Sequence, residues 1–478
     1  MSPERQIYLL DSMELPPETI AVAFAKTSRS PQSFRQIAAE LTEEKSAEFH
    51  EKWVVGYGHA SVAEHAVLHI AVENVSRLAV ECLESNRLAS YTEKSTRYQK
   101  WGLEDFYLPT ELETHPLRAL YEDTIRLLFE TYQAALTPVK EVIAGRTPRR
   151  EGESDAAFDR RIRSEYIDVC RFLLPAAALA NVGVTINARA LEHALRKMLS
   201  HPLAEVRQMG EEIRRVAQSR LPTLIKYVER VPYLEETARY FEEVAAGLPA
   251  SMPGEDWCRV EVSDPAGEER VLAAALVRFG AISFTEAREY VRHLPASQRG
   301  ELARALLSTL DRHDIPLREL EYALVTVELI MDQGGFFELK RHRMMTQTAQ
   351  PLSTRLGYAL PRAICEAGLE APYRGAMKAA HEAWARLAQA SPHVASYVVP
   401  NAYNRRVLLQ TNLRSALHLV RLRGAANAHF SMRRVAHRLA EEMRALFPLL
   451  GGYFTASESE TWQSVEREHF AETAALPL

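Results

Sequence analysis

Hydrophobic and polar residues alternate in two short runs, one in each half of the chain. Residues 68–73 read Leu-His-Ile-Ala-Val-Glu, and residues 324–329 read Leu-Val-Thr-Val-Glu-Leu. Alternation with a period of two is typical of a half-buried strand, and the β-branched residues favour the same structure. Residues 190–208 and 415–446 instead carry apolar residues at helix-like intervals. The pattern predicts a strand and, later, a helical segment in each half.

The order of these features indicates a tandem repeat. Pro175 stands twelve residues before Asn187, and Pro400 stands twelve residues before Asn412. Both asparagines begin an Asn-x-Arg sequence that leads into a predicted helix. We therefore predict an α+β protein of two tandem domains, each a small, mostly antiparallel sheet packed with helices.

Turn-forming residues near the middle of the chain predict where the domains join. Residues 245–254 contain two prolines and two glycines, which is typical of a segment between domains. The predicted parts are an N-terminal domain, a linker and a C-terminal domain, at residues 1–245, 246–256 and 257–478. The charged residues 145–155 have no counterpart in the second half. They predict a surface insertion near residues 140–165 rather than a nucleic-acid patch.

Length, composition and charge narrow the class of protein. The chain has 478 residues, of which 47% are hydrophobic and 25% charged, as in globular proteins of two or three domains. A net charge of -5 gives no basic field that would attract nucleic acid or an anionic membrane. The four cysteines form no CxxC pair, and the sequence has neither a signal-peptide pattern nor a long apolar run. We expect a cytoplasmic protein with no nucleic-acid or membrane partner.

Residues 85–98 combine hydroxyl, guanidinium and carboxylate groups. A guanidinium binds oxyanions through two hydrogen bonds, and a serine hydroxyl two residues away adds a donor, as Arg97 and Ser95 would do. Glu93 could accept a hydrogen bond from a ribose hydroxyl or a ring N–H. The alternative interpretation is a capped, solvated turn with a surface arginine.

A second basic cluster, Arg341-His342-Arg343, follows two phenylalanines. Arginine keeps its charge, so a buried cluster of this kind needs an anionic partner such as a phosphate, a flavin or a carboxylate. A basic surface turn is the alternative.

Other nucleotide-binding and metal-binding motifs are missing from the sequence. His59, Glu64, His65 and His69 do not have the spacing of a zinc site, so we predict structural histidines and no metal. The sequence contains no GxGxxG after a predicted strand and no GxxxxGK[ST], so it predicts neither a Rossmann site nor a P-loop.

The basic segments resemble the signature of the ThyX family of flavin-dependent thymidylate synthases. That signature reads Arg-His-Arg, two residues, Ser, four residues, Ser, one residue, Arg, usually followed by Tyr. The first half keeps the latter part at the family spacing, as Arg87, Ser90, Ser95, Arg97 and Tyr98. Ser85 and Asn86 replace the opening Arg and His.

The second half resembles the opposite end of the signature. It keeps the Arg-His-Arg cluster at residues 341–343, has Thr346 for the first serine, and reaches Ser353 and Arg355 after two extra residues. The His-x-x-x-x-Glu-His segment at residues 59–65 and the Asn-x-Arg segments follow the order of the family along nearly the whole chain.

The resemblance implies a composite site. In the family, one subunit presents Glu-x-Ser-x-Arg and an Arg four residues before a Pro, and a partner presents Arg-His-Arg and a later Arg that polarises the uracil ring. The N-terminal half keeps the first set, as Glu93, Ser95, Arg97 and Arg171. The C-terminal half keeps the second set, as Arg341, His342, Arg343 and Arg423. The opposite halves have Ser396 in place of Arg171 and Met198 in place of Arg423.

The activity implied by the resemblance is conversion of dUMP to dTMP. Methylenetetrahydrofolate would supply the carbon, reduced FAD the hydride, and NADPH the reduction of FAD, with Arg423 catalytic. The implied substrate-binding residues are Glu93, Ser95, Arg97, Arg171, Glu338, Arg341 and Arg423. The implied FAD-binding residues are Ser61, Glu93, Arg341, His342, Arg343, Asn412, Arg414 and His418. Asn187 and Arg189 are the alternative source of the Asn-x-Arg flavin contacts.

Three departures from the family leave alternatives open. Glu338 stands where the family often has Gln, Thr92 replaces an Asn, and Asn427 stands where a His often lies. The alternatives are a non-catalytic flavin- or nucleotide-binding scaffold and a flavoenzyme that modifies another pyrimidine nucleotide. Because the family assembles four domains, the resemblance implies a homodimer with one nucleotide site per chain. The sequence leaves open whether the paired halves come from one chain or two.

Overall fold

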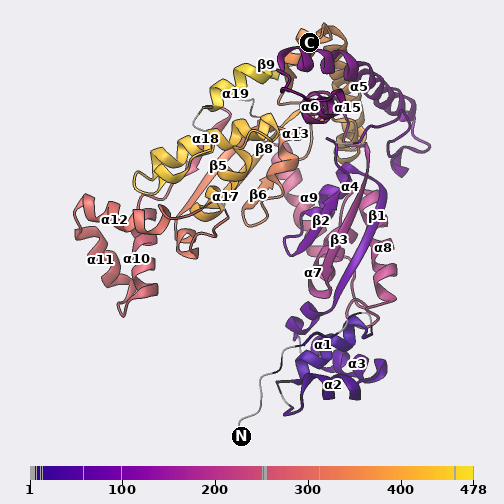
Figure 1. Ribbon diagram of the computed structural model, residues 1–478. Coiled ribbons are helices and arrows are strands. Elements are labelled where there is room, and N and C mark those ends of the chain that lie inside the picture. The colour runs from indigo at the N-terminus through magenta and orange to yellow at the C-terminus, as the bar shows by residue number, and fades with distance from the viewer. Residues whose placement is uncertain are drawn as a thin grey trace. The chain divides into compact units, whose positions relative to one another are not determined.

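The computed structural model describes residues 6, 8–10, 12, 14–28, 30–56, 59–97, 99–249, 251, 254, 256–311, 313–456 and 459–476. Tyr98 of the predicted signature lies outside the described residues, as do parts of the predicted linker. The chain divides into two compact units, shown in Figure 1. Unit 1 comprises Met1–Ser95, Asp105–Arg118 and Ala177–Ala250, and unit 2 comprises Thr96–Glu104, Ala119–Ala176 and Ser251–Leu478.

These units cut across the predicted halves. Residues 96–104 and 119–176 belong to the N-terminal half in sequence, yet they pack with the C-terminal half. The boundary at residues 246–256 therefore stays a prediction about the repeat. One division between the units, after Ala250, falls within these residues, and the others fall inside the N-terminal half.

Unit 1 contains one sheet and the helices around it. Its helices are α1 (Pro17–Lys26), α2 (Phe34–Glu40), α3 (Glu43–Phe49), η1 (His50–Gly56), η2 (Ala60–His65), α4 (Arg77–Glu84), η3 (Thr110–Leu112), α7 (Ala188–Leu199), α8 (Ala204–Gln218) and α9 (Pro232–Ala246). Its strands are β1 (Val67–Ser76), β2 (Ala89–Glu93) and β3 (Leu179–Asn187), in the antiparallel order β1-β3-β2.

Unit 2 contains two antiparallel sheets. The four-stranded sheet has the order β4-β5-β8-β6, and β7 pairs with β9. The strands are β4 (Cys258–Val262), β5 (Leu324–Asp332), β6 (Thr346–Ala349), β7 (Tyr358–Pro361), β8 (Asn404–Asn412) and β9 (Phe470–Ala475). The longer helices are α5 (Arg118–Arg146), α6 (Asp155–Cys170), α10 (Gly267–Phe279), α11 (Phe284–His293), α12 (Ala296–Leu307), α15 (Glu370–Ala390), α17 (Leu413–Arg423), α18 (Phe430–Leu446) and α19 (Trp462–His469). The shorter ones are η4 (Arg171–Leu173), η5 (Arg318–Tyr322), α13 (Gln333–Leu339), α14 (Arg362–Glu366), α16 (Pro392–Ala395), η6 (Ser396–Val398) and η7 (Gly451–Tyr453).

The two larger sheets repeat one arrangement, which confirms the predicted fold class. In each, a long strand pairs with the strand that ends at the Asn-x-Arg asparagine, so that Val67 lies opposite Asn187 and Leu324 opposite Asn412. Each long strand ends at a side chain that caps the next helix, Ser76 for α4 and Asp332 for α13. The predicted strands are confirmed as parts of β1 and β5.

Each predicted helical segment is two helices rather than one. Residues 190–208 fall on α7 and α8, which are separated by a turn that contains Pro202, and proline interrupts a helix. Residues 415–446 fall on α17 and α18, and α17 ends where Gly424 follows it. A loop of residues 424–429 therefore separates α17 from α18, and this loop contributes to the site described below.

The repeats meet inside unit 2 through equivalent residues. Pro175 and Pro400 form an antiparallel bridge, the Ala176 N–H donates to the Val399 carbonyl at 3.0 Å, and the Asn401 N–H donates to the Leu174 carbonyl at 3.0 Å. The segments that follow Arg171 and Ser396 therefore pair with one another within a single chain.

The charged residues 145–155 connect α5 to α6 and form ion pairs within unit 2. Arg161 contacts Glu153 at 2.7 Å and Arg149 contacts Asp155 at 2.7 Å, and both arginines lie over the Phe158 ring. Among the described residues, no helix combines the length and the apolar composition that crossing a membrane requires.

Candidate functional site

Two arginines of the N-terminal half share one buried carboxylate in unit 2. Asp168 lies in the last turn of α6 and is almost fully buried. It accepts a hydrogen bond from Arg97 at 2.6 Å, and its other oxygen lies 3.3 Å from Nε of Arg171. Burial raises the pKa of Asp168, and the two arginines oppose that shift. The carboxylate therefore fixes the orientation of both guanidinium groups.

Arg171 also binds the first turn of α13, which belongs to the C-terminal half. Its guanidinium donates to the Thr96 hydroxyl at 2.8 Å and to the Gly334 carbonyl at 3.3 Å. A Cβ atom at residue 334 would lie 3.2 Å from the Phe172 ring, so glycine allows this close approach.

Arg423, at the end of α17, forms the corresponding centre in the C-terminal half. It donates to Glu338 at 3.0 Å and to Nε2 of His342 at 3.1 Å. Burial lowers the pKa of His342 to about 3, with Arg423 and His418 acting in the same direction, so His342 is a neutral acceptor at pH 7. The His342 and His418 rings are 5.7 Å apart.

The two centres lie within electrostatic range of one another. Arg97 donates to the Asn427 carbonyl at 3.1 Å, in the loop that follows Arg423. Burial lowers the pKa of Arg423, Glu338 opposes this, and the charges of Arg341 and Arg97 add to it. The Arg341 side chain is exposed and has no hydrogen-bond or ion-pair partner in the described part of the chain, whereas Arg343 is half-buried and has contacts.

This cluster is rich in positive charge. Arg97, Arg171, Arg341 and Arg423 gather around the carboxyl groups of Asp168 and Glu338, and the charge of Arg171 also acts on the buried Asp332 carboxyl. Four guanidinium groups in a partly buried site favour an anionic ligand. The cluster, formed by residues of both repeats within one chain, can therefore bind a phosphate.

The predicted residues Glu93 and Ser95 belong to unit 1. Glu93 forms an ion pair with Arg77 at 3.1 Å, with both side chains almost fully buried. Ser95 is half-buried and has contacts. Because its two charges balance, the Glu93 pair carries no net charge with which to attract an anion.

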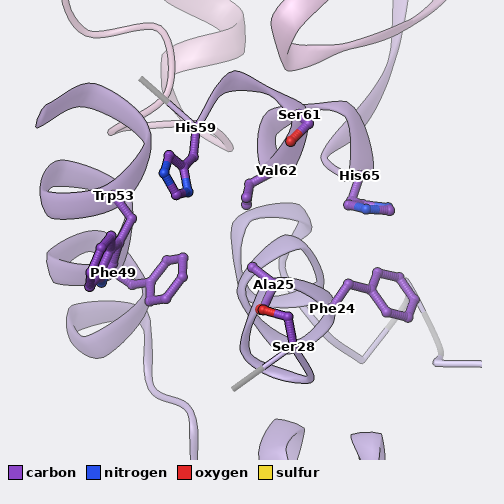
Figure 2. A pocket seen from close by; sticks show the side chains of 9 residues that line it. All are labelled: Phe24, Ala25, Ser28, Phe49, Trp53, His59, Ser61, Val62 and His65. Carbon is purple, nitrogen blue, oxygen red and sulfur yellow. The ribbon is translucent and has the colours of Figure 1, made fainter. Parts of the chain in front are cut away.

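Ser61 lines a pocket of about 270 Å³ in unit 1. Figure 2 shows Trp53 and Phe49 on one side of this pocket, Phe24 and His65 on the other, and Ser61 between them. Aromatic walls with a few hydroxyl groups suit a flat ring.

The Asn-x-Arg segments have structural partners in both halves. Asn187 caps α7 and Asn412 caps α17, each by accepting a backbone N–H three residues later. Arg189 pairs with Glu64 at 2.5 Å, and Arg414 with Glu321 at 2.9 Å.

In each repeat, some positions equivalent to the predicted site residues of the other repeat hold residues with structural contacts. Met198 is fully buried in the core of unit 1, and Asn86 is buried and donates to the Leu83 carbonyl. Arg355 is exposed over the Trp384 ring at 5.3 Å, and Ser396 donates to the Leu352 carbonyl at 3.2 Å. Of these four residues, Arg355 alone is a cation.

Sequence reasoning missed Asp168 and His429. An acid three residues before Arg171 on a helix was a readable signal for the ion pair. His429 is fully buried, and burial together with Arg171 and Arg97 keeps its pKa well below the usual value. No spacing rule pointed to this residue. Among the described residues, no group of three or more His, Cys, Asp or Glu side chains is arranged to hold a metal ion.

Comparison with known proteins places this arrangement in a family. The model of the family described as thymidylate synthase complementing protein, Thy1, matches residues 8–223 and again residues 261–449. A UPF0159 protein of Chlamydia muridarum is 31% identical over 433 residues, which cover 86% of this chain and 80% of the relative. A flavin-dependent thymidylate synthase of Thermococcus onnurineus is 32% identical over 206 residues, which cover 41% of this chain and 70% of the relative.

Solved structures show a weaker likeness. The UMP/dUMP methylase PolB of Streptomyces cacaoi, bound with 5-Br dUMP, is 18% identical with a TM-score of 0.35, covering 43% of this chain and 97% of that one. The flavin-dependent thymidylate synthase ThyX of Helicobacter pylori, complexed with FAD and dUMP, is 17% identical with a TM-score of 0.29, covering 45% and 96%. The two family matches, which together span most of the sequence, show that the chain belongs to the Thy1 family, the ThyX family of flavin-dependent thymidylate synthases, in a tandem duplicated form.

Proposed function

We propose that the chain is a flavin-dependent thymidylate synthase that binds dUMP in unit 2, in a site built by both repeats. The observation that carries the proposal is the convergence of Arg97 and Arg171 with Arg341 and Arg423 in one partly buried cluster that holds residues of both repeats. Family membership supplies the reaction class, and the four guanidinium groups supply a place for the nucleotide phosphate.

The arginines have different roles in this proposal. Asp168 and Thr96 hold Arg97 and Arg171 in fixed orientations, which suits binding of an anion present throughout the reaction. Arg423 is held by the Glu338 carboxylate and by the neutral His342 ring. A preorganised cation there stabilises charge that develops on the pyrimidine.

The residues around Arg423 fit a flavin cofactor. Arg341 is an exposed cation without a protein partner in the described residues, so it is free to bind a phosphate or the flavin edge. Neutral His342 and the neighbouring Arg343 complete the proposed FAD contacts, with Asn412, Arg414 and His418 on α17. In unit 1, the aromatic pocket that contains Ser61 is a further proposed FAD contact, and Glu93 and Ser95 stay proposed ligand contacts. FAD would supply the hydride, methylenetetrahydrofolate the carbon and NADPH the reduction of FAD.

A tritium-release assay tests this proposal. Purified protein reconstituted with FAD is expected to release tritium from carbon 5 of labelled dUMP only when methylenetetrahydrofolate and NADPH are present. Binding of FAD and dUMP without release would support a non-catalytic scaffold instead. No binding of either ligand would reject both functions.

A second candidate function, which Glu338 favours, is that of a flavoenzyme acting on another pyrimidine nucleotide. The Glu338 carboxylate is nearly buried and only accepts hydrogen bonds, so it could pair with an exocyclic amino group such as that of cytosine. This candidate would be supported if the protein released more tritium from labelled dCMP than from labelled dUMP.

A further inference from the structure

The C-terminal segment of residues 459–476 lies beyond the matched family region and docks onto unit 2 at several points. Strand β9 pairs with β7, and Arg362 donates to the carbonyls of Arg467 and Phe470 at 2.8 and 2.9 Å. Helix α19 packs along α18, where Arg434 contacts Glu466 at 2.7 Å. The segment is therefore an ordered part of the unit that contains the proposed nucleotide site.

His469 connects this segment to the loop that contacts Arg97 by way of Arg433, which also pairs with Glu460 of the segment at 3.4 Å. Nε2 of His469 lies 2.7 Å from the Arg433 guanidinium. A second nitrogen of Arg433 donates to the Ala426 carbonyl at 3.0 Å, and the next carbonyl, that of Asn427, accepts from Arg97 at 3.1 Å. Burial lowers the pKa of His469 to about 3, with Arg433 acting in the same direction, so the histidine is a neutral acceptor at pH 7.

Aromatic stacking holds the His469 ring in place from a second side. The His469 ring stacks on Phe430 at 4.9 Å, and Phe430 stacks on His429 at 4.4 Å. His429 contacts the Phe172 ring at 5.6 Å, and Phe172 follows Arg171 in the chain. The stack fixes the ring so that its nitrogen meets Arg433.

The middle of the loop, residues 425–428, has little support from other parts of unit 2. Ala426 and Asn427 are exposed. Within the loop, the Ala428 N–H donates to the Ala425 carbonyl and closes a turn. Gly424 packs so closely on Ala456 that a Cβ atom there would lie 2.3 Å from the Ala456 Cβ. Arg433 thus orients the Ala426 carbonyl, which precedes the Asn427 carbonyl that accepts from Arg97.

We propose that His469 is a positioning residue: by accepting from Arg433 it holds the loop of residues 424–429, and through the Asn427 carbonyl it sets the direction in which Arg97 points. The effect on nucleotide binding rests on the proposed function. The effect on the loop does not, because it concerns the ligand-free protein.

Three variants of the full-length chain separate this role from simple docking of the segment. His469→Phe keeps a ring to stack on Phe430 but removes the acceptor, and His469→Gln keeps an acceptor at similar reach. The matched control, Arg362→Met, removes two hydrogen bonds to the same segment without contacting the loop. Arg433→Gln weakens the contact between residues 433 and 469 from the side of residue 433. It replaces His469→Phe as the test variant if His469→Phe does not fold.

Hydrogen exchange of residues 424–429 and calorimetric titration with dUMP are the two measurements. His469→Phe is expected to speed exchange in the loop and to weaken dUMP binding about tenfold, while His469→Gln and Arg362→Met stay near wild type. Wild-type exchange in His469→Phe would overturn the proposal, and so would equal effects of Arg362→Met and His469→Phe. If wild type binds no dUMP, the proposed function fails, and the exchange data still decide the role of His469.

Discussion

At the residue scale, the partners of each arginine predict what its loss would do. Arg97 is held by Asp168 and the Asn427 carbonyl, an arrangement that suits an anion bound equally in the ground and transition states. Arg423 lies beside neutral His342 and Glu338, where new negative charge on a substrate would strengthen its interaction.

We expect Arg423→Ala to lower kcat by about 10²- to 10³-fold and to change the dUMP Kd much less. Arg97→Ala should instead weaken dUMP binding by about ten- to a hundredfold, as loss of a charge-assisted hydrogen bond does. Steady-state kinetics and calorimetry on both variants are the measurements, with Arg421→Ala on the same helix as the control. Equal losses of affinity with turnover intact would show that the two roles are assigned wrongly.

His342 gives a prediction for stability against pH. Its folded-state pKa of about 3 lies below the ordinary value of 6.5, so between these values the unfolded chain binds the extra proton. Stability is therefore expected to fall as pH decreases through this window, with a contribution of up to about 1.4 kcal/mol per pH unit. His342→Asn should flatten this dependence in urea unfolding between pH 7 and pH 4.5. Identical slopes for wild type and variant would contradict the neutral, buried state of His342.

At the element scale, the local pattern predicted strands well and helix limits poorly. The alternation at residues 68–73 and 324–329 lies within β1 and β5, because one face of each strand is more buried than the other. Apolar residues recur at helix-like intervals on both sides of Pro202 and Gly424, so the pattern did not show that helices end near these residues. Proline and glycine end them through backbone geometry. Arg97 and Arg171 could be selected from the sequence. Asp168 is recognised only once folding brings it to Arg97, 71 positions away.

The two asparagine caps give an element-scale prediction. Asn187→Ala and Asn412→Ala each remove a cap from an equivalent helix, so each should lower stability by about 1 kcal/mol. Only Asn412→Ala is expected to weaken FAD binding as well, because α17 also carries His418 and Arg423. Thermal melts and flavin fluorescence titration distinguish the two effects. A larger loss of FAD affinity in Asn187→Ala would assign the flavin contacts to the N-terminal repeat.

At the scale of the whole molecule, duplication allows the two repeats to divide one task. In a symmetric assembly of identical domains, each domain has to keep every residue of the site. Here Pro175 pairs with Pro400 within one chain, so one repeat can supply Arg97 and Arg171 while the other supplies Arg423. The equivalent positions are then free to become core, as Met198 has done.

The number of nucleotide sites tests this division of labour most directly. Calorimetric titration of the FAD-loaded chain with dUMP is expected to give one nucleotide per chain. Arg97→Ala should weaken that binding about ten- to a hundredfold. Arg355→Ala, which removes an exposed arginine over Trp384, should leave it nearly unchanged. Two equivalent nucleotides per chain, or equal sensitivity to the two substitutions, would contradict a single composite site.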